Sequence, residues 1–203
     1  TTVIESTVMG ELSVVERYQT NMLGWGLGSA DAIQFKVDSD IELMGVGMYV
    51  SQGSPTDKAN VKVFEGDGTT ELYSAEGVEY EGKDGEPGQL LFDEPIPISA
   101  DTMYCVEVQV IGPTGSSHYG NGVDTSTTDD GINWQWVYSS RSHNGTGNTS
   151  GQIPQFLYRL PRKGAAKLEL ADDDDTSGAV SGSAGAARQA FVDFCRTVVR
   201  QGE

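Results

Sequence analysis

Apolar and polar side chains alternate with a period of two along most of the first 160 residues. The longest alternating run, residues 102–110, places Tyr104, Val106 and Val108 on one face and Glu107 on the other. Because successive side chains of an extended strand point to opposite faces, this pattern predicts half-buried β-strands. The runs that share it, or that read as continuous apolar strands, are residues 32–37, 43–49, 60–64, 132–136 and 153–158.

Short clusters of turn-forming residues separate these runs, for example Gly66-Asp67-Gly68 and Asp130-Gly131. Many short strands with Gly-rich turns and no long interior helix are typical of an antiparallel sandwich or barrel. We therefore predict an all-β fold, a two-sheet antiparallel β-sandwich of about ten strands over residues 16–161. Residues 1–15 are predicted to form a leader strand or extension.

The pattern changes after Pro161. Residues 162–187 are rich in Gly, Ser and Ala and carry the acidic run 172–175, which is typical of a flexible linker. In residues 188–203 apolar side chains recur at helical spacing, which predicts a short amphipathic helix. We expect this helix to pack on this domain or begin the next one; a partner-binding helix is the alternative.

The chain is strongly acidic, with 30 acidic and 13 basic side chains among 203 residues and a formal net charge of −17. Sixteen of these net negative charges fall in residues 1–160. Nucleic acids and anionic membranes are excluded as partners, because both are bound by clustered Lys and Arg. No apolar run is long enough to cross a membrane. The start lacks a signal peptide and an initial Met, so we expect a piece of a longer protein.

Two cysteines, Cys105 and Cys195, are too few for a disulfide framework. They favour reduced thiols in a cytosolic or nuclear protein. Two glycosylation sequons, at Asn144 and Asn148, point the other way. Such matches arise readily by chance in a loop rich in Gly, Ser and Thr, so we expect no glycan.

Candidate chemistry is sparse. His118 and His143 are the only histidines, and no further ligands stand at the spacing of a zinc site. Asp124, Asp129 and Asp130 share one loop, but without the regular spacing of a calcium loop. Nucleophile-elbow and phosphate-loop motifs are absent. We predict no catalytic, metal or cofactor site, with a hydrolase that uses two facing carboxylates as a third alternative.

Tryptophans and glycines offer two further signals. Trp134 and Trp136 project from the same face of one predicted strand. Buried, they would be core, which is the favoured interpretation; exposed, they would be a platform for sugar stacking.

Gly45 and Gly47 interrupt an apolar strand. Glycine inside a strand marks a bend or bulge, or alternatively a shaped ligand surface.

Segments near both ends of the predicted sandwich resemble one known family. Residues 31–38 (DAIQFKVD) and 41–49 (IELMGVGMY) resemble the opening signature of the PHR domain of the Pam/Highwire family. Residues 144–146 (NGT) and 151–158 (GQIPQFLY) resemble its last loop and strand. The resemblance covers about residues 16–160. Within the family the chain is most similar to the second PHR domain of the giant Pam ubiquitin ligases.

The resemblance implies a sandwich of about eleven strands that acts as a non-catalytic protein-interaction module of a giant E3 ubiquitin ligase. It implies control of axon growth and synapse formation, in the cytoplasm, the axon or the nucleus. The implied partners are proteins: ligase substrates or adaptors, including ones with basic segments, and the rest of the ligase. No cofactor is implied. A carbohydrate-binding β-sandwich that uses Trp134 and Trp136 is the alternative.

Candidate protein-binding residues are those that lie in the stretches of resemblance or in Gly-rich turns. They are Asp31, Gly45, Gly47, Gly120, Gly122, Asn144, Gly145, Gly151 and Gln152.

Overall fold

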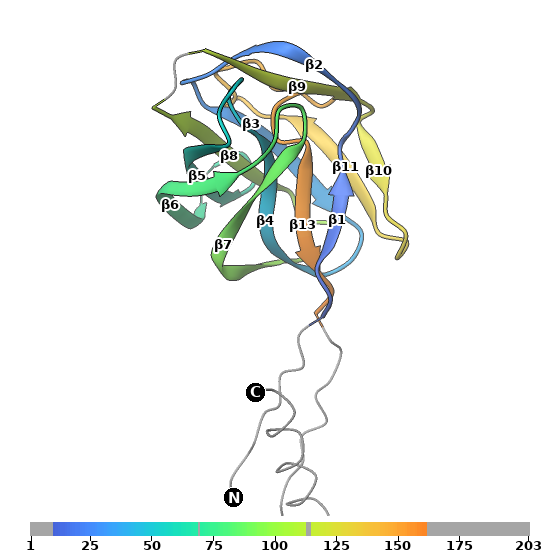
Figure 1. The fold of residues 1–203 in the computed structure, drawn as a ribbon. Helices are drawn as coiled ribbons and strands as arrows, with labels where there is room; N and C mark the ends of the chain where they lie inside the picture. Colours follow the sequence, from blue (N-terminus) through green and yellow to red (C-terminus); the bar gives the residue numbers. More distant parts are fainter. Residues whose placement is uncertain (1–9, 69, 113–114, 162–203) are drawn as a thin grey trace, which may run out of the picture. The chain divides into compact units, whose positions relative to one another are not determined.

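The computed structural model describes residues 10–68, 70–112 and 115–161. In these ranges the chain forms strands and no helix, and neighbouring strands pair antiparallel. Two larger sheets face each other, and a smaller third sheet lies across one end (Figure 1). The predicted all-β sandwich is confirmed. The predicted linker at 162–187 and helix at 188–203 lie outside the described residues.

One face of the sandwich is a four-stranded sheet in the order β1–β13–β4–β7. Its strands are β1 (Ser13–Glu16), β13 (Gln155–Arg159), β4 (Ile41–Tyr49) and β7 (Pro87–Ile98). The first and last strands of the domain are neighbours, with Ser13 opposite Tyr158. The paired β1 spans the boundary predicted at residue 16 between leader and sandwich.

The opposite face is a six-stranded sheet in the order β10–β11–β3–β8–β5–β6. Its strands are β10 (Thr125–Thr127), β11 (Asn133–Tyr138), β3 (Asp31–Val37), β8 (Tyr104–Ile111), β5 (Thr56–Glu65) and β6 (Thr70–Glu81). The third sheet has the order β12–β9–β2, with β12 (Ser150–Gly151), β9 (Ser116–Gly122) and β2 (Tyr18–Gly26). The described chain thus has more strands than predicted, because short strands and the third sheet add to the two main layers.

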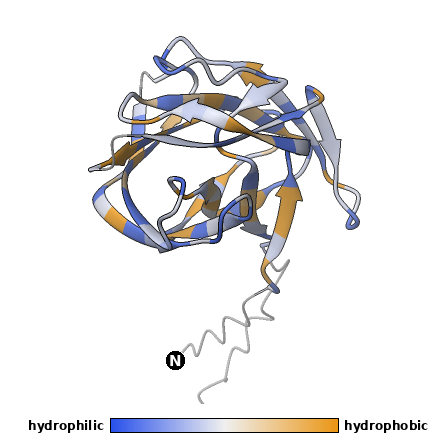
Figure 2. Cartoon of the chain, turned by 45° about the horizontal axis from the view of Figure 1, so that its top comes forward, coloured by the Kyte–Doolittle hydropathy of each residue, from blue (hydrophilic) through white to orange (hydrophobic). Residues whose placement is uncertain are grey.

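The core lies between the two larger sheets, where one side chain in two points inward; the alternation is visible along the strands in Figure 2. Its centre is aromatic: the ring of Phe35 lies 5.6 Å from that of Trp134 and 5.1 Å from that of Phe156. Trp134 and Trp136 are each only 1% exposed, so both are core residues. The carbohydrate-binding alternative required exposed indole rings for sugar stacking, and these two rings are buried, so they cannot stack on a sugar.

Gly45 marks a β-bulge in β4. The register with β7 shifts between Leu43 and Gly45, so that Leu43 and Val46 both face the core. A Cβ atom on Gly45 would lie 2.3 Å from the carbonyl oxygen of Leu90. Glycine at this position permits close approach of β7, as expected where a strand bends.

Candidate functional site

Seven of the nine predicted site residues come together at one end of the sandwich. We call this region the cap and define it as the strands β2, β9 and β12 with the loop of residues 139–149. The residues gathered in the cap or at its base are Asp31, Gly120, Gly122, Asn144, Gly145, Gly151 and Gln152. Gly45 and Gly47 lie outside it, in β4, where a Cβ atom on Gly47 would meet the side chain of Gln155.

The carboxylate of Asp31 joins the cap loop to the sandwich. Asp31 begins β3, is 3% exposed, and accepts hydrogen bonds from Trp25 Nε1 at 3.2 Å, Asn144 Nδ2 at 2.9 Å and Thr146 Oγ1 at 2.6 Å. Burial raises the pKa of Asp31 above its usual range, although the bonds from Asn144, Thr146 and Trp25 act in the opposite direction. One buried acid therefore orients side chains from β2 and from the cap loop.

A buried arginine holds the other end of the cap loop. Arg17 is 1% exposed, and its guanidinium donates to the carbonyl oxygens of Gly147 at 2.8 Å, Gln152 at 3.0 Å and Ile153 at 2.9 Å. It also lies over the ring of Tyr18, 4.6 Å from the centroid. Burial lowers the pKa of Arg17. The carbonyl dipoles and ring face replace the water that the buried cation has lost.

The cap glycines are close-packed. A Cβ atom on Gly120 would lie 2.1 Å from Cδ2 of Tyr18, and one on Gly151 would lie 2.2 Å from Oγ1 of Thr146. Gly151 also has φ +129°, a backbone conformation that residues with a side chain rarely adopt. These contacts give the glycines a packing role; a contribution to partner binding stays a prediction.

Sequence reasoning missed several residues that build the cap, notably Arg17, Tyr18, Trp25 and Thr146. Tyr18 donates from its hydroxyl to the carbonyl of Gln152 at 3.0 Å, and Thr146 accepts from the backbone N–H of Gln152 at 2.8 Å. The one available signal was Arg17, one of few basic residues in an acidic region. Its partners are backbone carbonyls far along the chain, which no local spacing reveals.

The outer surface of the cap is exposed and partly apolar. Residues 19–24 of β2 are all exposed, with Met22 at 47% and Leu23 at 46%. Trp25 is half-buried, and its ring lies 5.1 Å from that of Tyr119 on β9. Exposed apolar side chains on a firmly held scaffold are typical of protein-binding surfaces.

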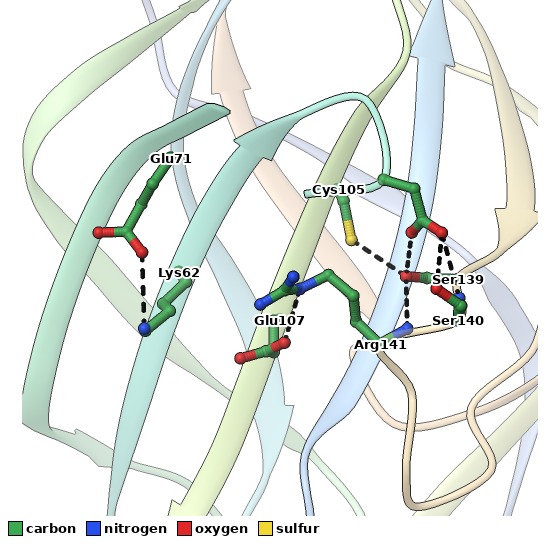
Figure 3. A network of polar contacts seen from close by, with 8 residues as sticks. Lys62, Glu71, Cys105, Glu107, Ser139, Ser140 and Arg141 are labelled. Atoms are coloured by element: carbon green, nitrogen blue, oxygen red, sulfur yellow. Dashed lines mark hydrogen bonds and ion pairs between the residues drawn. The ribbon is translucent and has the colours of Figure 1, made fainter. Parts of the chain in front are cut away.

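A second polar network fixes the start of the cap loop on the outer face of the six-stranded sheet (Figure 3). Asp67 accepts hydrogen bonds from the hydroxyls of Ser139 at 2.6 Å and Ser140 at 2.8 Å. Partial burial acts against ionisation, but these bonds lower the pKa of Asp67. Arg141 donates to Glu107 at 2.8 Å and covers the ring of Phe64 at 3.9 Å. The loop therefore begins from a fixed position.

Cys105 lies in this network and is fully buried, with its sulfur 3.3 Å from Ser139 Oγ. Burial raises the pKa of its thiol to about 11. We expect the thiol to react with Ellman's reagent at about pH 8 at least about 100-fold more slowly in the folded protein than in urea, because so little thiolate is present. A Cys195→Ser variant isolates this signal. Equal rates in the two states would show that the thiol is accessible.

Most positive charges of the described residues are engaged locally. Five basic side chains form ion pairs with glutamates: Lys58 with Glu79, Lys62 with Glu71, Lys83 with Glu86, Arg141 with Glu107, and Arg159 with Glu42. The net charge is therefore carried by the remaining carboxylates. Some of these line a groove of about 500 Å³ between β1 and β10, which includes Glu16, Asp129 and Asp130.

No group of three or more His, Cys, Asp or Glu side chains within residues 10–68, 70–112 and 115–161 is arranged to hold a metal ion. His118 approaches one carboxylate, with Nδ1 3.4 Å from Asp84 Oδ1. In the same ranges there is no helix with the length and hydropathy needed to span a bilayer.

The sequence is similar to parts of two very large proteins. It is 38% identical over 161 residues to the E3 ubiquitin-protein ligase MYCBP2 of Danio rerio. This alignment covers 74% of this chain and 4% of the ligase. It is 34% identical over 165 residues to the E3 ubiquitin-protein ligase highwire of Drosophila melanogaster, covering 76% of this chain and 3% of that ligase. The chain therefore spans only a small fraction of the ligases that it matches.

A smaller relative shares the same region. BTB/POZ domain-containing protein 6-B of Danio rerio is 30% identical over 145 residues, which covers 64% of this chain and 27% of that protein. The family model of the PHR domain matches residues 16–159, which begins at the end of β1 and ends at the last residue of β13. Since this match covers more than half of the chain, the protein belongs to the PHR domain family.

Proposed function

We propose that this domain is a non-catalytic protein-interaction module of a giant E3 ubiquitin ligase, and that it brings substrates or adaptors to the ligase. The observation that carries the proposal is the similarity to MYCBP2 and highwire, both named as E3 ubiquitin-protein ligases, of which this chain matches only 4% and 3%. A segment of that size corresponds to one domain of such a protein. By the same relationship we propose a role in axon growth and synapse formation, in the cytoplasm, the axon or the nucleus.

The cap is the surface that we propose for partner binding. Two buried charged side chains, Asp31 and Arg17, fix the cap loop through hydrogen bonds, and Asp31 also accepts one from Trp25 of the exposed strand β2. A surface that is already ordered loses little conformational freedom when a partner binds. In this proposal Asp31, Gly151 and Gln152 are positioning residues, since they are buried and act through the shape of the loop.

A capture experiment tests this function. The chain of residues 1–203 is immobilised and exposed to neuronal lysate. It is compared with a Met22→Ala/Leu23→Ala double variant and with a Leu72→Ala control, whose side chain is exposed on β6. Truncation of binding hot spots weakens association by more than about fivefold, so we expect the first variant to lose the captured proteins and the control to retain them. Capture no greater than by an unrelated β-sandwich would refute the interaction function.

The acidity of the domain gives a second test on any protein captured in this way. Complementary charge accelerates association, and salt screens it. We expect the association rate to fall at least about tenfold between roughly 50 and 500 mM salt, measured by surface plasmon resonance. An association rate that does not change with salt would contradict the preference for basic partners.

A further inference from the structure

One edge of the cap sheet has no neighbouring strand. In the order β12–β9–β2, strand β2 pairs with β9 on one side, and no described strand pairs with it on the other. In Figure 1, β2 runs along the outer rim of the cap. Its residues 19–24 are exposed on both faces. The backbone N–H and C=O groups on such an edge are available for pairing with an added strand.

The regular part of this edge is short and well defined. The pairing register between β2 and β9 shifts between Tyr18 and Thr20 and again between Leu23 and Trp25. Between the two shifts, Thr20, Asn21, Met22 and Leu23 lie opposite Asn121, Gly120, Tyr119 and His118 in unbroken order. The two irregularities therefore delimit a straight segment that presents its outer edge to solvent.

The side chains that usually protect an edge strand are missing here. Native proteins discourage unwanted pairing with Pro or with charged side chains, especially Lys, on the exposed strand. Strand β2 has the sequence YQTNMLGWG, with neither. Two large apolar side chains, Met22 and Leu23, are instead nearly half exposed on it. Because they are consecutive, they point to opposite faces of β2, and each would contact side chains on its own face of an added strand. Such side-chain contacts are how strand addition acquires specificity.

Acidic side chains flank this edge. Asn21 Nδ2 donates to the carbonyl of Gly85 at 2.8 Å, which places the β6–β7 turn and its Asp84 and Glu86 beside the middle of β2. Glu16 lies just before the strand. The nearby cations do not cancel this charge, because Arg17 is buried and Lys83, 3.5 Å from Glu86, offsets only that carboxylate and leaves Asp84 and Glu16.

We propose that β2 binds an extended partner segment with apolar residues and flanking Lys or Arg, which adds to the cap sheet as a fourth strand. The proposal rests on the interaction function above and names its surface and partner chemistry. A second copy of this chain is the less favourable occupant, because edge-to-edge pairing would bring the two copies of Asp84, each beside the middle of β2, close to one another. Like charges in such a contact oppose association.

The test uses a synthetic peptide, acetyl-Lys-Lys-Val-Thr-Val-Thr-Val-Lys-Lys-amide, titrated into the isotope-labelled chain of residues 1–203 and followed by backbone amide NMR. We expect saturable shifts centred on residues 19–24. N-methylation of alternate peptide amides removes two or more backbone hydrogen bonds and should weaken binding at least about tenfold. Replacement of the four Lys by Glu should weaken it to a similar extent.

Two variants of the domain complete the design. Met22→Lys puts a positive charge on β2 that repels the Lys residues of the peptide, and it removes an apolar contact. We therefore expect at least about tenfold weaker peptide binding. Leu72→Lys is the matched control, since Leu72 is 40% exposed on the edge strand β6, and we expect affinity within about twofold of the wild type. Thermal unfolding of both variants checks that they fold.

Several results would overturn the proposal: no shifts, shifts centred on another surface, equal binding of the N-methylated peptide, or dimerisation that Met22→Lys abolishes. Met22→Lys is also added to the lysate capture. If it retains every protein that the wild type captures, the edge proposal fails while the interaction function stands. Absence of any specific capture would instead refute the function itself.

Discussion

Replacing Asp31 with Asn is expected to lower the free energy of unfolding by about 3 kcal/mol, measured by urea denaturation. The substitution keeps the shape of the side chain but puts an NH₂ group where a carboxylate oxygen accepted hydrogen bonds. Trp25, Asn144 and Thr146 all donate to this carboxylate, so at least one donor would face another donor in a buried site. The buried cation Arg17 would also lose a favourable charge interaction.

Asp93→Asn is the matched control, because Asp93 is exposed on β7, and we expect its unfolding curve to overlay that of the wild type. The pH dependence supplies a second criterion. Since the folded-state pKa of Asp31 is raised, the folded protein binds the proton more tightly than the unfolded chain between the ordinary and raised pKa values. The wild type should lose stability relative to Asp31→Asn as the pH rises through that window. Equal stabilities of the two proteins at neutral pH would refute the network.

Gly151→Ala is expected to destabilise the domain by about 3 kcal/mol through two separate effects. The first is backbone strain, because Gly151 has φ +129°. The second is overpacking, because the new methyl group would overlap with the side chain of Thr146. Thr146 has little room to give way, since it is fully buried and its hydroxyl donates to Asp31. Thermal and urea unfolding measure the loss.

Gly24→Ala separates these two effects. Gly24 has a similar φ, +123°, but an added Cβ atom would meet no heavy atom within 4 Å. We expect it to lose only the strain contribution, about 1–2 kcal/mol, and therefore to be clearly more stable than Gly151→Ala. If both variants lost the same amount, the contact with Thr146 would not matter.

The strands that sequence reasoning identified are those whose side chains alternate between apolar and polar or are continuously apolar. Residues 32–37 and 102–110 alternate cleanly, and they correspond to β3 and β8. Strand β2 was missed because residues 19–24 are all exposed and carry no alternating pattern. Strand β7 contains Pro87, Pro95 and Pro97, which argue against a central strand; its place at the edge of the four-stranded sheet makes them tolerable.

The candidate site was predicted only in part, for a physical reason. Asp31, Asn144, Gly145, Gly151 and Gln152 were selected because their segments resemble the PHR family, and the structure brings them together. Arg17 was not selected because its hydrogen bonds go to the backbone of residues 147, 152 and 153. Backbone carbonyls are present at every position, so no side-chain pattern identifies which of them a buried cation will contact.

The position of Arg17 has a consequence for how the domain is made. Its carbonyl partners lie 130 to 136 residues further along the chain. Chains are synthesised at about 5–20 residues per second, so the guanidinium waits several seconds for them. Until then, burial would leave the cation without compensation, and the strands around it cannot close. Folding of the cap is therefore coupled to synthesis of residues 147–153, and a chain truncated before residue 147 could not complete the cap.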